Sequence, residues 1–175
     1  PIHSSAASDV YKRQAFENND RPGIMLAGSV RAYANRWATA VGDRIAIFTN
    51  NDDAYRTAHD LHQLGVEIAA VIDSRPEAPK SNSFEVLSAS EVVNTHGRLG
   101  LNSIDVKTPQ GLRQIQVSGL GVSGGWNPNI HLTCHQRGRP QWDAALSAFI
   151  PSAELPEGLH VAAVSYTHLT LPTSG

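Results

Sequence analysis

Apolar residues recur every three or four positions across residues 24–39, and this spacing predicts an amphipathic helix. Residues 44–49 and 66–73 are short runs that are mostly apolar, as is typical of parallel strands buried on both faces. Between them, residues 52–64 have helical spacing again, and Gly65 follows where a left-handed helix cap is expected. A strand, a helix and a strand in this order predict a right-handed βαβ unit.

The chain after this unit changes to shorter apolar runs. Residues 84–87 are predicted to form a third parallel strand at the edge of the same sheet. Alternating runs separated by glycine and proline predict an antiparallel meander over residues 91–118, followed by a further strand at residues 119–123. An amphipathic pattern predicts a short helix over residues 143–149. The predicted fold class is therefore α/β, a Rossmann-like βαβ nucleotide-binding domain with an antiparallel β-meander.

The overall composition excludes several classes of protein. The 175 residues carry a formal net charge of −2, whereas a nucleic acid or an anionic membrane requires a clustered basic surface. No apolar run approaches the roughly 18 to 20 residues that span a bilayer. Cys134 is the only cysteine, so an intramolecular disulfide is impossible. We therefore expect a soluble cytoplasmic protein that binds neither nucleic acid nor membrane.

The two ends of the chain differ in character from its middle. Residues 1–14 resemble a translated adaptor sequence of the kind found in environmental sequence assemblies, and residues 164–175 resemble its counterpart. Sequences of this origin are excluded from reasoning about a fold. The alternative is a pair of ordinary polar tails. On the first interpretation the native part is residues 15–163, a piece of a longer protein.

The turn between the first strand and its helix is the place where a βαβ unit binds a dinucleotide. Such a site has the pattern GxGxxG or GxGxxA, with an acidic residue about twenty positions later. Ala54 matches the third position, and Asp73 stands where an acid that binds ribose belongs. Thr49 and Asn51 replace the two leading glycines, although Asn tolerates the positive φ that the turn needs. The side chain of Asn51 would project toward an approaching pyrophosphate.

Negative charge at the start of the helix also disfavours a dinucleotide at this turn. Helix N-termini attract anions, but Asp52 and Asp53 already occupy this one. Two unit charges about 4 Å apart repel by roughly 4 kcal/mol at an effective dielectric constant of about 20. Asn50 or Asn51 can cap the same helix. The turn is therefore either a functional dinucleotide site or a degenerate unit with a structural role only.

The run SGGWNP at residues 123–128 is the next specific motif. Gly124 and Gly125 follow a buried strand, so the backbone there must turn sharply or approach another group closely. Trp126 adds a large flat surface beside them. Either a tight turn with a packed tryptophan or a contribution to a cofactor site explains this run.

His131, Cys134 and His135 form a cluster that has the side chains of a metal site but not the spacing of one. Zinc takes four protein ligands in structural sites, or three with a water molecule in catalytic ones. We interpret the cluster as ordinary loop or helix residues. No motif for a nucleophile or a metal occurs elsewhere in the sequence, so we predict no metal and no catalytic residue in this chain.

Two runs give the chain a specific resemblance to a known family. These runs are NNDRPGIML at residues 18–26 and FTNNDDAYRTA at residues 48–58. Together with SGGWNP they resemble the alpha subunit of heterotetrameric sarcosine oxidase. The resemblance covers nearly all of residues 15–163 and departs at Gly119, where we would expect an acidic residue. Shorter matches lie at residues 131–132, 142–143 and 149–151.

The resemblance implies the two-dinucleotide-domain fold of disulfide reductases, in which a second domain interrupts the first. Residues 15–23 would then leave the first domain, residues 24–123 would form the inserted second domain, and residues 124–163 would return to the first. The glycine-rich motif of the first domain would lie before residue 15. A folate-binding region would lie after residue 163.

The resemblance also implies an activity, which is oxidative demethylation of sarcosine to glycine. Oxygen is reduced to peroxide, and the methyl carbon passes to tetrahydrofolate. The family uses FAD, FMN and NAD and assembles from alpha, beta, gamma and delta subunits, although no cofactor is assigned to this chain alone. The cofactor-binding residues would be Asn50, Asn51, Asp73, Gly124, Gly125 and Trp126. Two alternatives stand beside this one: a related opine or amine oxidase alpha subunit, and a non-catalytic scaffold with a degenerate nucleotide-binding unit.

Overall fold

The computed structural model describes residues 10–11, 14–127, 130–134, 138–143 and 148–151. The chain divides into two compact units, and each is described by itself. The larger unit is Arg13–Gly125, and the smaller unit combines Pro1–Lys12 with Trp126–Gly175. Among the described residues, no helix is long and apolar enough to cross a membrane.

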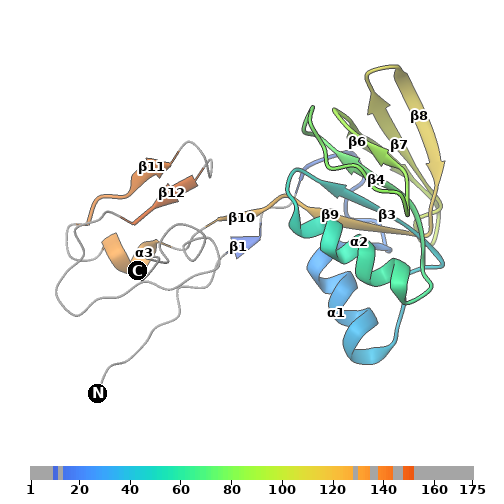
Figure 1. Cartoon of the computed structure of the whole chain (residues 1–175), viewed down its shortest axis with the longest axis horizontal. Coiled ribbons are helices and arrows are strands. Elements are labelled where there is room, and N and C mark those ends of the chain that lie inside the picture. The colour runs from blue at the N-terminus through green and yellow to red at the C-terminus, as the bar shows by residue number, and fades with distance from the viewer. Residues whose placement is uncertain (1–9, 12–13, 128–129, 135–137, 144–147, 152–175) are drawn as a thin grey trace. The chain divides into compact units, whose positions relative to one another are not determined.

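A five-stranded parallel sheet forms the centre of the larger unit (Figure 1). Its strands lie in the order β2-β9-β3-β4-β5, and each neighbouring pair is parallel. The strands are β2 (Ile24–Leu26), β3 (Arg44–Thr49), β4 (Glu67–Asp73), β5 (Val86–Leu87) and β9 (Gly119–Ser123). The carboxyl ends of β9, β3 and β4 therefore lie side by side at one edge of the sheet.

The two faces of the sheet have separate apolar cores, because successive residues of a strand point to opposite sides. On one face Ile47 packs with the buried residues of α1 (Ala27–Trp37) and α2 (Asp53–Gln63). On the other face Phe48 packs with buried residues of the meander. Figure 1 shows the two helices on one side of the sheet and the meander on the other.

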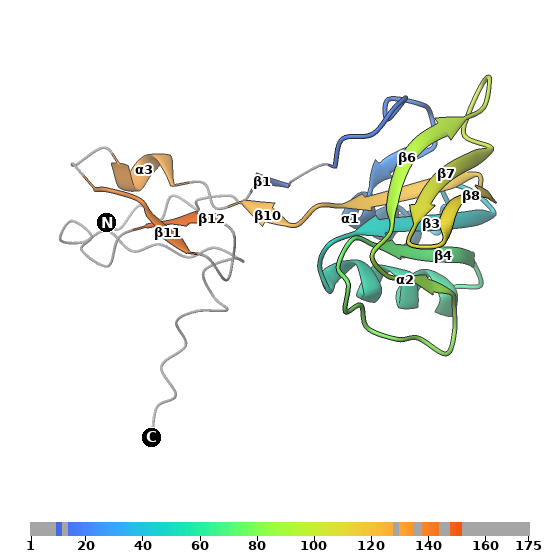
Figure 2. The ribbon, with the colours of Figure 1, turned by 90° about the horizontal axis from the view of Figure 1, so that it is seen from above.

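The meander is a three-stranded antiparallel sheet, as predicted (Figure 2). Its strands are β6 (Glu91–His96), β7 (Ser103–Thr108) and β8 (Gly111–Gln116). The predicted strand at residues 119–123 is confirmed as β9, which lies between β2 and β3. The predicted edge strand at residues 84–87 is also confirmed, although β5 covers only its last two residues.

The predicted βαβ unit is confirmed, and the end of its helix has the expected cap. Gly65 has a φ of +84°, and its N–H donates to the carbonyl of His62 at 3.0 Å. The N–H of Val66 donates to the carbonyl of Leu61 at 3.0 Å. These two bonds satisfy carbonyls of the last turn that have no partner within the helix. The chain can therefore reverse from α2 into β4 within a few residues.

The predicted helix over residues 24–39 is wrong at both of its ends. Residues 24–26 form β2 and pair with β9, a strand that is distant in the sequence. The helix α1 begins at Ala27 and ends at Trp37, because Ala38 takes a left-handed conformation with a φ of +47°. The apolar spacing of residues 24–26 fits a helix or a strand, and backbone pairing with β9 decides between them.

The smaller unit contains short elements. β1 (Val10–Tyr11) pairs antiparallel with β10 (Trp126–Asn127), so part of the predicted N-terminal tail contacts the chain. The other elements are α3 (His131–Cys134), β11 (Gln141–Asp143) and β12 (Ala148–Ile150). The rest of residues 1–14, except Gln14, and all of residues 164–175 lie outside the described part.

The predicted helix over residues 143–149 is wrong. β11 and β12 form an antiparallel pair in which Trp142 lies directly opposite Phe149. The centroids of these two rings are 5.1 Å apart in an edge-to-face arrangement, which is a favourable geometry for aromatic pairs. A cross-strand aromatic contact therefore outweighs the weak helical spacing of this short segment. Residues 144–147 lie outside the described part.

Candidate functional site

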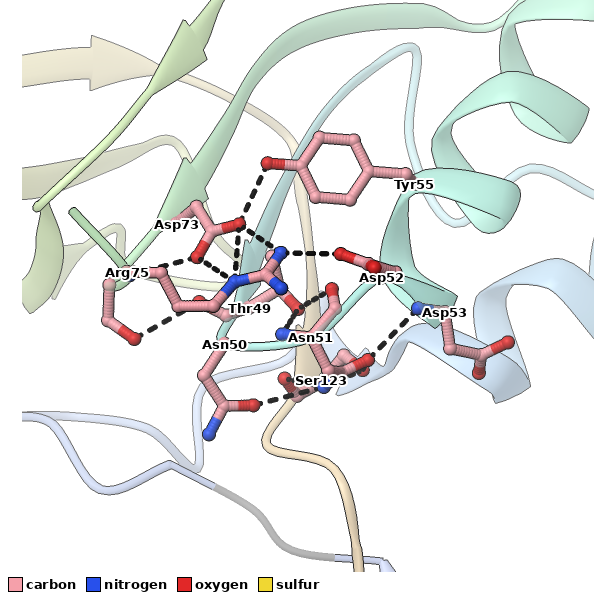
Figure 3. A network of polar contacts seen from close by, with 10 residues as sticks. Thr49, Asn50, Asn51, Asp52, Asp53, Tyr55, Asp73, Arg75 and Ser123 are labelled. Atoms are coloured by element: carbon pink, nitrogen blue, oxygen red, sulfur yellow. Dashed lines mark hydrogen bonds and ion pairs between the residues drawn. The ribbon is translucent and has the colours of Figure 1, made fainter. Parts of the chain in front are cut away.

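Polar side chains gather at the carboxyl ends of β9, β3 and β4, where α2 begins (Figure 3). In open α/β sheets this edge is where ligands bind. The structure brings together most of the predicted site residues there: Asn50 and Asn51 after β3, Asp73 at the end of β4, and Gly124 and Gly125 after β9. Trp126 belongs to the smaller unit, in β10.

Thr49 and Asn51 hold the turn between β3 and α2 with their side chains. The buried hydroxyl of Thr49 accepts the N–H of Asn51 and donates to its carbonyl, each at 3.0 Å. The side-chain carbonyl of Asn51 accepts the N–H of Asp53, the first residue of α2, at 3.1 Å. The N-cap of α2 is Asp52, whose side chain makes no cap bond, so the prediction of an asparagine N-cap is wrong, although Asn51 one position earlier accepts a free N–H of the first turn. Neither Thr49 nor Asn51 has a positive φ, so the left-handed conformation expected at Asn51 is also wrong, and hydrogen bonds of the two side chains hold the turn instead.

The amide of Asn51 also connects this turn to the end of β9. Its nitrogen lies 3.0 Å from the carbonyl oxygen of Ser123 and 3.1 Å from the hydroxyl oxygen of the same residue. The backbone N–H of Asn50 donates to the same carbonyl at 3.4 Å. Gly125 has a φ of +87°, and a Cβ there would be 3.8 Å from the side chains of Asn50 and Asn51. The turn therefore fixes the place where β9 ends.

Asp73 is fully buried at the end of β4 and is surrounded by donors. Its Oδ2 accepts the hydroxyl of Tyr55 at 2.8 Å and the Nη2 of Arg75 at 2.8 Å. Its Oδ1 accepts the backbone N–H of Arg75 at 3.0 Å and the Nε at 3.1 Å. Arg75 also binds Asp52 at the start of α2, with 2.7 Å between Nη2 and Oδ1. The guanidinium thus bridges the end of β4 and the start of α2.

These contacts set the ionisation states of Asp73, Tyr55 and Arg75. Burial alone would raise the pKa of Asp73, but hydrogen bonds from Arg75 and Tyr55 and the charge of Arg75 outweigh it and lower that pKa. Burial raises the pKa of Tyr55 strongly, and the adjacent carboxylate raises it further. The contact with Asp73 raises the pKa of Arg75. Asp73 and Arg75 are therefore a charged pair and Tyr55 is neutral at pH 7.

A dinucleotide does not fit this turn as its side chains stand. The carboxylate that would hold a ribose is buried and already has at least two donors on each oxygen. The N–H of Asp53, which would face a phosphate, is bonded to Asn51. Asp52, with a side chain that is 76% exposed, adds a negative charge where a pyrophosphate would approach. The side chains present bind one another instead.

Arg75 and Tyr55 were not predicted as part of this site. Tyr55 lies on α2 with its ring buried, while its hydroxyl reaches Asp73. Arg75 lies two residues after the acid, in the segment between β4 and β5. The sequence does show an arginine two residues after an acid at the end of a strand, and this proximity makes an ion pair between them possible. Whether the arginine side chain turns toward the acid depends on the loop conformation, which residue spacing does not predict.

The described residues contain no group of three side chains that could hold a metal ion. His131 and Cys134 lie on the single turn of α3, and His135 lies outside the described part. The thiol of Cys134 is exposed. No metal chemistry is assigned to this cluster.

Solved structures with a similar fold include dehydrogenases and disulfide reductases. L-proline dehydrogenase of P. horikoshii superposes with a TM-score of 0.65 at 18% identity, over 90% of this chain and 28% of that one. Bacillithiol disulfide reductase of Staphylococcus aureus gives 0.59 at 10% identity, over 82% and 45%. An FAD-dependent pyridine nucleotide-disulphide oxidoreductase of Desulfovibrio vulgaris gives 0.58 at 13% identity, over 82% and 43%. The chain thus has the predicted Rossmann-like fold of the disulfide-reductase type.

Sequence similarity narrows this class to one family. The chain is 40% identical over 149 residues to the sarcosine oxidase subunit alpha of Rhizobium meliloti, which covers 84% of this chain and 15% of that subunit. It is 38% identical over 151 residues to the same subunit of Corynebacterium strain U-96, covering 78% and 16%. The chain belongs to the family of sarcosine oxidase alpha subunits and spans about one sixth of their length. It matches no family model.

Proposed function

We propose that this chain is a segment of a sarcosine oxidase alpha subunit and serves an oxidoreductase that demethylates sarcosine to glycine. The observation that carries the proposal is the 40% identity to such a subunit over 149 residues. Oxygen would be reduced to peroxide, and the methyl carbon would pass to tetrahydrofolate. The beta, gamma and delta subunits would be its partners, and the complex would be cytoplasmic.

The domain assignment is part of the same proposal. Residues 24–123 would form the inserted second domain, with residues 15–23 leading into it and residues 124–163 returning to the first. In support, the first and last strands of this segment, β2 and β9, are hydrogen-bonded neighbours. The boundary between the two compact units falls after Gly125, two residues beyond the proposed end of the inserted domain. Residues 14–23 belong to the larger unit as well, where the ring of Phe16 lies 6.0 Å from that of Phe48, so the proposed boundary at residue 23 is not one between the compact units.

The intact complex would use NAD, FAD and FMN. Gly124, Gly125 and Trp126 would contribute to a nucleotide site of the first domain from the returning chain. This fits the position of Gly124 and Gly125 directly after the carboxyl end of β9. Asn50, Asn51 and Asp73 are the other residues that the resemblance implies for a cofactor, but they lie at the turn that does not accommodate a dinucleotide as it stands, so they are not part of this proposal.

A chimeric enzyme tests the proposal. Residues 15–163 would replace the matching segment of the Rhizobium meliloti alpha subunit, which would be produced together with its partner subunits. We expect an assembled complex that makes peroxide when sarcosine is added, at about one tenth of the parent rate or more, a barrier increase of about 1.4 kcal/mol or less. The control carries Val30→Asp, because a charge at this fully buried position of α1 prevents correct packing. An assembled chimera without sarcosine-dependent activity would contradict the proposal.

A further inference from the structure

We propose that the turn between β3 and α2 is closed to dinucleotides by the chain's own side chains, with Arg75 taking the place of the ribose hydroxyls on Asp73. The bonds of Asn51 to Ser123 would then fix the end of β9. The inference rests on the contacts at this turn and does not depend on the substrate of the intact complex.

The ribose side of the site is filled by Arg75 and Tyr55. An ionised carboxylate offers about four acceptor positions. Arg75 supplies a backbone N–H, Nε and Nη2 to Asp73 at 2.8 to 3.1 Å, and Tyr55 supplies its hydroxyl at 2.8 Å. The Asp73 side chain is 0% exposed. A ribose would have to displace a charge-assisted fork, which is stronger than a bond between neutral groups.

The phosphate side of the site is filled by Asn51. Its side chain reaches from the N–H of Asp53 to the carbonyl of Ser123, so it spans the space between α2 and β9. In a dinucleotide site a glycine at this place lets the pyrophosphate approach the backbone. Replacing that glycine by a bonded amide blocks the same approach.

The charges of the turn also disfavour the approach of a pyrophosphate. Among the residues that the structure describes, Arg75 is the basic side chain bonded to this group, and it faces two carboxylates, Asp73 and Asp52. With Asp53 at the first position of α2, the turn keeps a net negative charge. A pyrophosphate would meet repulsion from the carboxylates of Asp52 and Asp53 even at a helix N-terminus.

Arg75 has one other interpretation that the experiment must separate. In dinucleotide sites an arginine near the ribose acid accommodates the 2′-phosphate of NADP. Such an arginine must be free to meet the phosphate. Here the guanidinium is bound to two carboxylates, which favours closure over recognition of NADP.

Calorimetric titration of the full chain with NAD and with NADP tests the closure. Asn51→Gly with Asp52→Asn opens the phosphate side and leaves the Arg75 fork in place. Adding Arg75→Gln opens the ribose side as well. We expect dissociation constants above about 1 mM for the unmodified chain and the double variant, and NAD binding at least about tenfold tighter for the triple variant. As a matched control, Arg113→Gln takes the place of Arg75→Gln in the triple variant, because Arg113 is paired with Glu85 and not with a residue of the turn.

Several results would overturn the proposed closure of the turn. Micromolar binding of NAD or NADP to the unmodified chain would overturn the closure. A folded triple variant with no gain in affinity would overturn the role of Arg75.

If the triple variant does not fold, the closure is tested instead by labelling the carboxyl groups of the unmodified chain with a carbodiimide and an amine. Closure predicts labelling of Asp52, which is 76% exposed, and about tenfold less labelling of the buried Asp73. Equal labelling would overturn the proposal.

Discussion

At the turn after β3, side chains rather than glycines determine the path of the backbone. Thr49 and Asn51 bond to each other, and Asn51 extends the network to α2 and β9. Asp73 and Arg75 complete it from β4. The positions of Asn51 and Asp73 at this edge were predictable, because the βαβ pattern places them there. The partners were not predictable, because Arg75 reaches Asp73 through a loop whose course no periodicity describes.

The buried Asp73 gives the first prediction at this scale. Asp73→Asn should lower the free energy of unfolding at pH 7 by about 2 to 3 kcal/mol, because hydrogen bonds to charged groups contribute about 1.5 to 3 kcal/mol. The amide would also place donors against donors of Arg75. Glu85→Gln is the control, because its exposed pair with Arg113 contributes about 1 kcal/mol or less. Urea denaturation of both variants measures the difference. Similar losses for the two variants would contradict a special role of the buried carboxylate.

The same carboxylate makes stability depend on pH in a defined direction. Against the effect of burial, Arg75 and Tyr55 lower the pKa of Asp73 in the folded chain, whereas the unfolded chain has an ordinary value near about 4. The ionised group therefore stabilises the fold above about pH 4, and this stabilisation is lost as the pH falls through the lower folded-state value. The gap between the unmodified chain and Asp73→Asn should stay constant from about pH 7 to about pH 5 and narrow below about pH 4. A gap that widens toward low pH would contradict this sign.

At the scale of elements, the βαβ pattern was predicted correctly, whereas β2 and the pair of β11 and β12 were not. α2 and the strands on either side of it have consistent spacing, a cap and a stop, so local and tertiary preferences agree. β2 has only three residues and depends on a partner strand, β9, that is distant in the sequence. The pair of β11 and β12 likewise depends on a contact between Trp142 and Phe149. Three residues carry too little periodicity to distinguish a helix from a strand.

Gly65 provides the prediction for the elements. Gly65→Ala should lower the free energy of unfolding by about 1 kcal/mol, because alanine is strained at a φ of +84°. No atom lies within 4 Å of the added methyl group, so the cost reports backbone conformation alone. Gly100→Ala is the matched control, because there the nearest atom is an ordinary 3.7 Å away and no positive φ is needed. Thermal and urea denaturation of the two variants separate these effects. An equal cost at both positions would show that the left-handed cap is not the cause.

At the scale of the whole molecule, the two apolar clusters of the described residues both lie within the larger unit. The residues of both apolar clusters lie between Phe16 and Val122, on either face of the parallel sheet. The described part of the smaller unit contains short pairs of strands and one helical turn. We therefore expect the larger unit to keep its fold without residues 1–14 and 164–175.

Truncation tests this independence. Removing residues 1–14 and 164–175 should leave the melting temperature of the larger unit unchanged within about 2 °C, since a loss of 1 kcal/mol lowers it by about 4 °C or more in a domain of roughly 100 residues. The cut removes β1 and with it the pairing with Trp126–Asn127, but both partners belong to the smaller unit. The melting transition should be followed by the near-ultraviolet circular dichroism of Tyr55, which is buried in the larger unit. The Tyr55→Phe variant shows how much of this signal comes from Tyr55. A control cut that also removes residues 15–23 takes away Phe16, which packs on Phe48, and should lower the same transition clearly. A drop of more than about 4 °C from the first cut alone would show that the ends belong to the fold and are not adaptor sequence.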